Sequence, residues 1–159
     1  MHIALYQPDI PQNTGTILRM AVCFQLSVDI IGPAGFDLST RALKRAGLDY
    51  LERATFDLHE DFDSFLRDRV QKDDMRLVLS TTKGSTSFLD FKFENRDILL
   101  MGRESAGAPP DVHDAADARI CIPMQQGNRS LNLAISTAII TSEALRQTNG
   151  FHFEENIST

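Results

Sequence analysis

The stretch from Arg119 to Gln147, RICIPMQQGNRSLNLAISTAIITSEALRQ, indicates the fold more clearly than any other part of the chain. Its first residues, 119–122, are expected to form a buried strand, which Pro123 closes because proline has no N–H for the ladder. A polar loop with a glycine follows, and a long helix is predicted to open near Arg129 or Ser130, where a hydroxyl can accept a free backbone N–H. A loop between the carboxyl end of a strand and the start of a helix is where α/β proteins bind ligands.

The predicted helix has apolar side chains on two faces: Leu131, Ile135, Ala138 and Leu145 on one, and Leu133 and Ile140 on the other. Such a helix is expected to be buried on more than one flank. Each large aliphatic side chain, if fully buried, would stabilise the fold by about 1.5–3 kcal/mol as an upper estimate. Burial alone would explain the helix, but it does not explain the polar and turn residues that lead into it.

The rest of the chain alternates between apolar strands and helices. Strands are predicted at residues 2–7, 28–32, 54–58, 76–82, 97–102 and 119–122. Helices are predicted from the first proline-containing loop to about Leu26, over residues 40–46 and 61–70, and at the C-terminal end. This alternation predicts an α/β fold with a mostly parallel sheet and flanking helices. We expect one domain over residues 1–159, with 149–159 as a flexible tail.

Composition narrows the class of protein further. The formal net charge of −6 argues mildly against a general nucleic-acid binder. The first ten residues hold an apolar run too short for a signal peptide or a membrane span, so a cytoplasmic protein without a membrane partner is expected. Cys23 and Cys121 lie far apart and are predicted to be reduced thiols in the core. The four histidines form no cluster in the sequence, so no metal site is predicted.

Polar segments follow three of the predicted strands: PQNTGTILR after the first, MGRESAGAP after the fifth and IPMQQGNRSLN after the sixth. None contains the G-x-G-x-x-G pattern or the Lys-Ser/Thr pair of phosphate-binding loops, and the chain has no G-x-S-x-G nucleophile motif. The residues alone therefore predict an α/β domain with a ligand site built from three loops.

Taken together, the three segments resemble the motifs of the SPOUT methyltransferases, which are α/β enzymes that use S-adenosylmethionine. The similar segments are PDIPQNTGTILRMA, LLMGRESAG and IPMQQGNRSLNLAIS, and RAGLDY and TTKG add to the likeness. The likeness is greatest to the small branch that methylates the ribose 2′-oxygen of the wobble nucleotide of tRNA, cytidine or uridine 34. It implies a C-terminal trefoil knot, a homodimer, S-adenosylmethionine as cofactor with S-adenosylhomocysteine as product, and tRNA as partner.

The resemblance also implies roles for individual residues. The cofactor would be held by Ser80, Gly102, Gly107, Ile122, Met124, Ser130 and Leu131. The chemistry would involve Asn13, Arg19, Glu104, Ser130 and Asn132. Basic residues expected to contact RNA are Arg41, Lys44, Arg45, Lys83, Arg103 and Arg129.

Each of these residues also has a purely structural interpretation. The two glycines can be turn residues, Ser130 and Asn13 can cap helices, and Glu104 can pair with a nearby arginine. The trio Arg41, Lys44 and Arg45 shares one predicted helical face, which can simply be solvated.

Arg19 lies on an otherwise apolar helical stretch, where a surface arginine can also extend its charged end into water. A guanidinium has a pKa above about 12 and no acceptor, so Arg19 is not expected to act as a base. We expect it to hold the adjacent phosphate and to stabilise the developing alkoxide.

Three other functions remain open at this point. The chain could be a knotted RNA-binding protein without catalysis, a ribose methyltransferase acting on another RNA, or a flavodoxin-like binder of small molecules.

Overall fold

The computed structural model describes residues 1–38, 53–84 and 86–151. In this part of the chain, seven strands form one sheet in the order β3-β2-β1-β6-β4-β7-β5, and each neighbouring pair is parallel. The strands are β1 (His2–Tyr6), β2 (Ser27–Ile31), β3 (Phe56–His59), β4 (Arg76–Ser80), β5 (Thr86–Ser87), β6 (Asp97–Met101) and β7 (Ala118–Cys121). The helices are α1 (Pro11–Phe24), α3 (Phe62–Phe65), the π-helical segment η1 (Leu66–Gln71), α4 (Pro110–Ala115) and α5 (Leu133–Thr148). The predicted α/β class is therefore confirmed, whereas the C-terminal knot stays a prediction.

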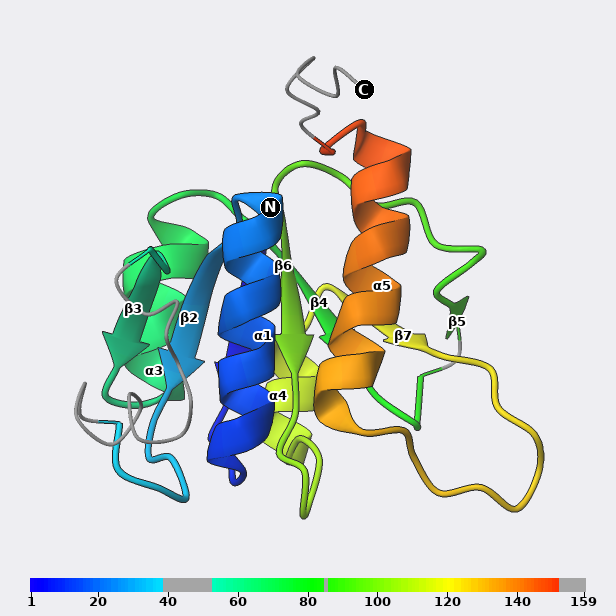
Figure 1. The fold of residues 1–159 in the computed structure, drawn as a ribbon, viewed down its shortest axis with the longest axis horizontal. Helices are drawn as coiled ribbons and strands as arrows, with labels where there is room; N and C mark the ends of the chain where they lie inside the picture. The colour runs from blue at the N-terminus through cyan, green and yellow to red at the C-terminus, as the bar shows by residue number, and fades with distance from the viewer. Residues whose placement is uncertain (39–52, 85, 152–159) are drawn as a thin grey trace, which may run out of the picture.

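Helices cover both faces of the sheet, with α1 and α5 on one face and α3 and α4 on the other (Figure 1). The alternation of side chains along β1 supplies both cores. Ile3 and Leu5 pack in the core beneath α1, whereas Ala4 and Tyr6 pack on the opposite face with Phe65 of α3. Inner strands buried on both faces require the near-continuous apolar runs that the sequence shows.

The C-terminal helix differs from its prediction in two respects. It begins at Leu133 rather than near Arg129 or Ser130, because the side chain of Asn132 is the N-cap. The prediction that this helix is buried on more than one flank is also wrong for the single chain, since Ile135 is 54% exposed. Its buried side holds Ile140 and Leu145 with small and hydroxyl-bearing residues, whereas Ile135 and Ile139 lie on the outer face.

Other differences are local. Helix α1 ends at Phe24, two residues before Leu26, because Gln25 takes a left-handed conformation. The segment expected as one helix over 61–70 divides into α3 and η1, and the two-residue strand β5 was not predicted. Cys23 is exposed, so it is not a core thiol. The predicted helix over residues 40–46 lies outside the described residues.

The parallel sheet fixes where the polar loops lie. The loops that follow β1, β6 and β7 leave the same edge of the sheet, because all three strands run in one direction. This edge is at the lower side of Figure 1, below α1 and α5. None of the helices in the described part of the chain is both long and apolar enough to span a membrane.

Candidate active site

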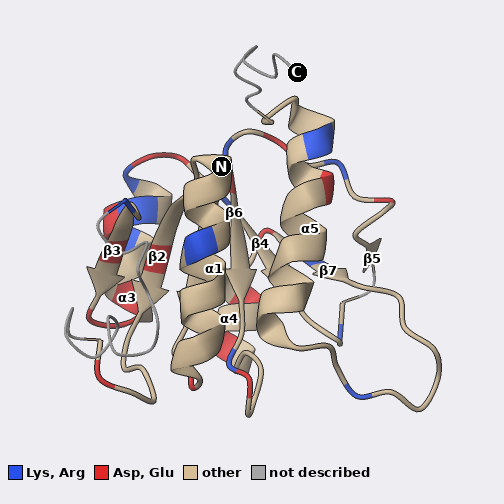
Figure 2. Ribbon diagram, viewed as in Figure 1, with Lys and Arg blue, Asp and Glu red and all other residues tan. Residues whose placement is uncertain are grey.

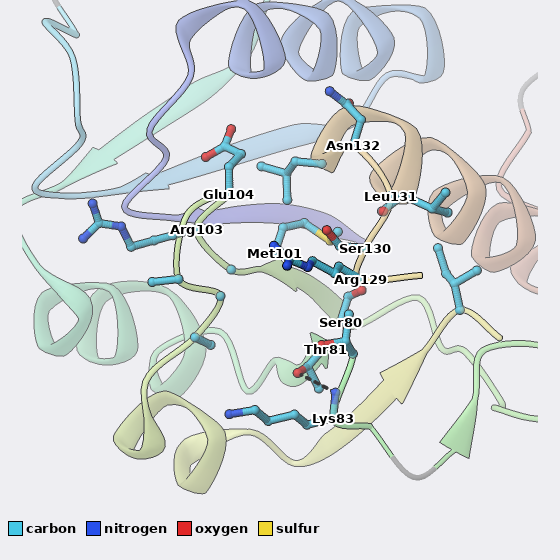
Figure 3. A pocket seen from close by; sticks show the side chains of 18 of the residues that line it. Ser80, Thr81, Lys83, Met101, Arg103, Glu104, Arg129, Ser130, Leu131 and Asn132 are labelled. Atoms are coloured by element: carbon cyan, nitrogen blue, oxygen red, sulfur yellow. Dashed lines mark hydrogen bonds between the residues drawn. The ribbon is translucent and has the colours of Figure 1, made fainter. Parts of the chain in front are cut away.

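Three loops meet around one cavity at the carboxyl ends of the strands (Figure 3). We call them the first loop (residues 7–13), the second loop (102–109) and the third loop (122–132). The cavity has a volume of about 490 Å³, which is in the range of small-molecule sites. Its lining includes many of the residues predicted for the site: Asn13, Ser80, Lys83, Gly102, Arg103, Glu104, Gly107, Ile122, Met124, Arg129, Ser130, Leu131 and Asn132.

A chain of hydrogen bonds joins the three loops. The amide of Asn132 donates to the side-chain oxygen of Asn13 over 2.9 Å, and the amide of Asn13 donates to Oε1 of Glu104 over 3.0 Å. The other oxygen of Glu104 accepts the backbone N–H of Asp9 at 2.8 Å. Asn13 is not the N-cap of α1, which is Ile10. Within the described residues the hydrogen bonds to Glu104 come from amides, and its charge also acts on the neighbouring Arg103, whose pKa is raised by a hydrogen bond to Asp9 and further by Glu104.

The third loop ends at the cap of α5. Oδ1 of Asn132 accepts the N–H groups of Ala134 and Ile135, at 2.9 and 3.3 Å. Asn132 therefore satisfies two free donors of the first helical turn and also holds Asn13. Ser130 lies two residues before the cap and lines the cavity, so its interpretation as the N-cap is wrong.

The second loop is a tight hairpin closed by two backbone hydrogen bonds. Arg103 N–H donates to the carbonyl of Gly107 over 3.0 Å, and Gly107 N–H donates back over 2.9 Å. Gly107 has φ +69°, which a residue with a side chain rarely adopts. A Cβ at Gly102 would lie 2.7 Å from the carbonyl carbon of Gly107. Gly102 is thus required by the chain's own hairpin, in addition to any contact with a ligand.

The cavity walls differ in chemistry. Ile122, Met124 and Leu131 provide apolar surface on the side of the third loop, and Ser80 lies at the end of β4. Lys83 and Arg129 also line the cavity (Figure 3). An apolar wall with backbone groups and a few polar side chains can hold a purine ring and a ribose, and cations at the same site can attract an anionic substrate.

The structure does not bring every predicted residue to the cavity. Arg19 is exposed on α1 and is absent from the described residues that line the site. It lies six residues beyond Asn13, and at about 3.6 residues per helical turn the two side chains leave α1 on different faces. Arg41, Lys44 and Arg45 lie outside the described residues.

Sequence reasoning missed Asp9, which the structure places at the centre of the contacts between the first and second loops. Its Oδ1 pairs with Nη2 of Arg103 at 2.5 Å, and its Oδ2 accepts the N–H and hydroxyl of Ser105 at 3.1 and 2.5 Å. Hydrogen bonds from Arg103 and Ser105 lower the pKa of Asp9 to about 2. The only sequence signal for Asp9 as a site residue was its position three residues after the end of the first strand.

Comparison with known proteins agrees with this arrangement. The sequence profile of the SpoU rRNA Methylase family matches residues 1–142. A tRNA (cytidine(34)-2′-O)-methyltransferase of Ancylobacter novellus is 50% identical over 149 residues, which is 94% of each chain.

Two solved structures are also similar. One, described as giving structural insights into the 2-OH methylation of C/U34 on tRNA, has a TM-score of 0.86 and 39% identity, and the match covers 94% of this chain and 96% of that one. The other is an AdoMet-bound rRNA methyltransferase from Sinorhizobium meliloti, with a TM-score of 0.80 and 28% identity. That match covers 91% of this chain and 55% of the other.

The parallel α/β fold that the chain shares with these structures, together with its identity to methyltransferases, defines an RNA methyltransferase that uses S-adenosylmethionine. The chain belongs to the SpoU rRNA methylase family.

Proposed function

We propose that this protein methylates the ribose 2′-oxygen of nucleotide 34, cytidine or uridine, in tRNA, with S-adenosylmethionine as the methyl donor. The observation that carries the proposal is the hydrogen-bonded chain from Asn132 through Asn13 to Glu104, which joins all three loops around the cavity. The similarity of nearly the whole chain to tRNA (cytidine(34)-2′-O)-methyltransferases supports the choice of substrate.

The cavity fits the cofactor. Ile122, Met124 and Leu131 offer an apolar wall for the adenine, and the second loop with Gly102 and Gly107 exposes backbone close to the cavity. The side chains of Ser80 and Ser130 add hydroxyl groups that can bond the ribose or the amino-acid part. When bound, S-adenosylmethionine supplies an electrophilic methyl group, and S-adenosylhomocysteine is the product.

The remaining residues have two roles, which are to order the walls of the site and to stabilise charge on the substrate. Asn13 and Asn132 hold Glu104 and the start of α5 in one arrangement, so the walls of the site are ordered before the ligands bind. Arg19 keeps its proton, since a guanidinium has a pKa above about 12. Its charge would hold the phosphate next to the target ribose and stabilise the alkoxide that develops at the 2′-oxygen, while the proton leaves to that phosphate or to water.

A homodimer would explain two observations. Arg19 lies away from the cavity of its own chain, and a second copy can bring it to the site. Large apolar side chains are also exposed just before α1, in the third loop and on α5, namely Ile10 (42%), Leu131 (40%), Ile135 (54%) and Ile139 (36%). We expect light scattering to give a dimer mass at micromolar concentration, and Ile139→Glu to shift the mass towards the monomer. A wild-type monomer would contradict the dimer.

The tRNA would be bound by local basic groups, because the chain is acidic overall. Lys83 and Arg129 line the cavity, and Arg41, Lys44 and Arg45 remain candidates outside the described residues. Each phosphate contact that is lost should reduce the slope of log affinity against log salt by about one. A tRNA-modifying role also favours the cytoplasm as location.

The decisive experiment is to map ribose methylation. Purified protein is incubated with S-adenosylmethionine and tRNA from a strain that lacks the gene, and 2′-O-methylation is located by resistance of the RNA to alkaline cleavage. New methylation at nucleotide 34 supports the proposal. Methylation only at other positions or in ribosomal RNA would assign another substrate, and S-adenosylmethionine binding without any transfer would favour an RNA-binding protein without catalysis.

A further inference from the structure

The second loop provides one wall of the cavity, and its attachment to the rest of the protein depends on few contacts. Within the loop, the two backbone hydrogen bonds between Arg103 and Gly107 close the hairpin. Towards the first loop, Arg103 and Ser105 both bond the carboxylate of Asp9. Arg103 also bonds Gln7, and Glu104 accepts from Asn13 and from the N–H of Asp9. Since two of these three side chains bond the one carboxylate, the position of this wall depends in large part on where Asp9 is held.

Asp9 itself is held firmly by its backbone. Its N–H donates to Oε2 of Glu104 over 2.8 Å, and the carbonyl of Pro8 accepts the N–H of Gly35 at 2.9 Å. Gly35 packs closely on it, because a Cβ there would lie 3.1 Å from both Cα and Oδ1 of Asp9. The carboxylate is thus a fixed point between the first loop, the second loop and the segment around Gly35.

We propose that Asp9 is a positioning residue of the cofactor site, which latches the second loop onto the first, and that Arg103 acts in this latch rather than as an RNA contact. The inference rests on the proposed function for the identity of the ligand. It differs from the sequence-based assignment of Arg103 to the RNA-binding residues.

The contacts of Arg103 favour this assignment. Nη2 donates to Oδ1 of Asp9 at 2.5 Å and Nη1 donates to Oε1 of Gln7 at 3.2 Å, so the guanidinium joins two residues of the first loop. The side chains of Arg103 and Asp9 are 34% and 18% exposed. Although Arg103 lines the cavity, Figure 3 shows its side chain extending away from Met101 and Ser130, which also line it. A guanidinium paired with a carboxylate in this way has little net charge to offer a phosphate.

The latch also reaches the cavity. Glu104 and Gly107 lie in the hairpin that Arg103 and Ser105 hold, and both line the site. Loss of the carboxylate leaves the backbone N–H of Asp9 in place but removes the bonds to Arg103 and Ser105. We therefore expect the loop to become mobile and the cofactor to bind more weakly, while the sheet and the remaining core stay unchanged.

The test uses Asp9→Ala, Arg103→Ala and the double variant, with S-adenosylhomocysteine as the probe in calorimetry. Each single change should weaken binding about tenfold, the scale for losing charge-assisted hydrogen bonds. The double variant should be no weaker than either single variant, because both changes open the same latch. In turnover, KM for S-adenosylmethionine should rise about tenfold while kcat changes by less than a few-fold. The salt slope of tRNA binding should be unchanged.

Two further variants separate positioning from general stability. Arg96→Ala removes an exposed arginine that pairs with Asp74 and Glu94, outside the residues that line the cavity, and should leave S-adenosylhomocysteine affinity unchanged. Asp9→Asn keeps the size of the side chain and an acceptor for Ser105 but removes the charge, and should give an intermediate loss. This variant keeps the test valid if Asp9→Ala does not fold.

Amide hydrogen exchange tests the latch without any bound ligand. The amides of Ser105 and Gly107 should exchange faster in Asp9→Ala and Arg103→Ala than in the wild type. Unchanged exchange and unchanged S-adenosylhomocysteine affinity in folded variants would overturn the proposal. So would an Arg103→Ala protein that binds S-adenosylhomocysteine normally but loses about one unit of the tRNA salt slope. The wild type could also fail to bind S-adenosylhomocysteine while the amides of the variants still exchange faster than those of the wild type. That result would contradict the proposed function and leave the latch standing.

Discussion

The carboxylates of Asp29 and Glu104 belong to two polar networks whose hydrogen-bond partners differ. Asp29 on β2 is fully buried and bonds His2 at 3.2 Å, His59 at 2.8 Å and Nε of Arg69 at 3.0 Å. Glu104 at the cavity accepts only uncharged donors among its recorded hydrogen bonds in the described residues, the amide of Asn13 and the N–H of Asp9.

The difference follows from the surroundings of each carboxylate. A charge taken fully out of water must be paired, and Asp29 has an arginine and two imidazoles on the face of the sheet that α3 and η1 cover. Figure 2 shows this region as acidic bands on β2 and β3 beside basic ones on the neighbouring helical segment. Glu104 is partly exposed at the cavity, where water can solvate it, so neutral donors are sufficient. The buried carboxylate of Asp29 is therefore paired with charged or ionisable groups, whereas the partly exposed carboxylate of Glu104 is held by amides.

The change expected to separate site from scaffold most completely is Gly102→Val. Its side chain would meet the backbone of Gly107 and displace the hairpin as well as occupy the cavity, so binding of S-adenosylmethionine should be abolished. Calorimetry on the folded variant measures this, with Ala115→Val on an exposed part of α4 as the matched control. Unchanged affinity in folded Gly102→Val would contradict the placement of the cofactor beside the second loop.

Arg19→Ala should affect chemistry alone. We expect methyl transfer to fall about a hundredfold, the scale for removing one charge-stabilising donor, while affinity for S-adenosylmethionine stays within a few-fold. Single-turnover transfer and calorimetry give the two numbers, and Arg67→Ala on η1 serves as a control for the loss of an exposed arginine.

Arg19→Lys tests the electrostatic role. Lysine keeps the charge but lacks the planar fork, so activity should return in part. An unprotonated base at this position would instead work as well or better as lysine at high pH. Full activity in Arg19→Ala would remove the mechanism.

Asp29→Asn should lower stability and leave the site intact. Burial raises the pKa of Asp29, but hydrogen bonds from His2 and His59 and the charge of Arg69 outweigh this, so the pKa lies below its usual 3.8. The ionised form therefore stabilises the fold above about pH 4, and this contribution is lost as the pH falls through the lowered pKa.

Breaking such a buried pair costs about 3 kcal/mol of unfolding free energy at pH 7. Urea unfolding measures the loss, which should shrink as the pH is lowered below 4, and Asp63→Asn at an exposed position is the control. S-adenosylhomocysteine affinity below that of the wild type in the folded variant would show that the two networks are coupled.

The succession of the longer strands and the loops along the chain could be predicted from the sequence because it depends on local patterns. Continuous apolar runs identified the inner strands, and a parallel sheet places the loops after them at one edge. This is why the loops that hold Asn13 and Asn132 could be assigned to one site, whereas the roles of these two residues came from the family resemblance.

The remaining features depend on contacts between distant residues. Ser130 and Asn132 are both good N-caps, and the structure places the cap at Asn132, which also bonds Asn13, 119 residues away. Apolar periodicity cannot distinguish a buried face from one that another molecule covers, so the exposure of Ile135 was not foreseen. The pairing of Asp9 with Arg103 spans 94 residues and has no local signal.

Asn132 offers the finest test, because the same side chain caps α5 and donates to Asn13. Asn132→Asp keeps an oxygen for the cap and adds a negative charge at the helix N-terminus, so thermal stability should equal or slightly exceed that of the wild type. It removes the donor to Asn13, whose side-chain oxygen then faces a carboxylate oxygen, and we expect methyl transfer to fall about tenfold.

Asn132→Ala removes both the cap and the donor. It should lose the same activity and, in addition, about 1 kcal/mol of stability. Melting curves and kcat for the two variants, measured side by side, separate the roles. Wild-type activity in Asn132→Asp would show that the bond between Asn132 and Asn13 is dispensable for the chemistry. The hydrogen bonds from Asn132 through Asn13 to Glu104 would then serve only to stabilise the fold, as the Asp29 network does.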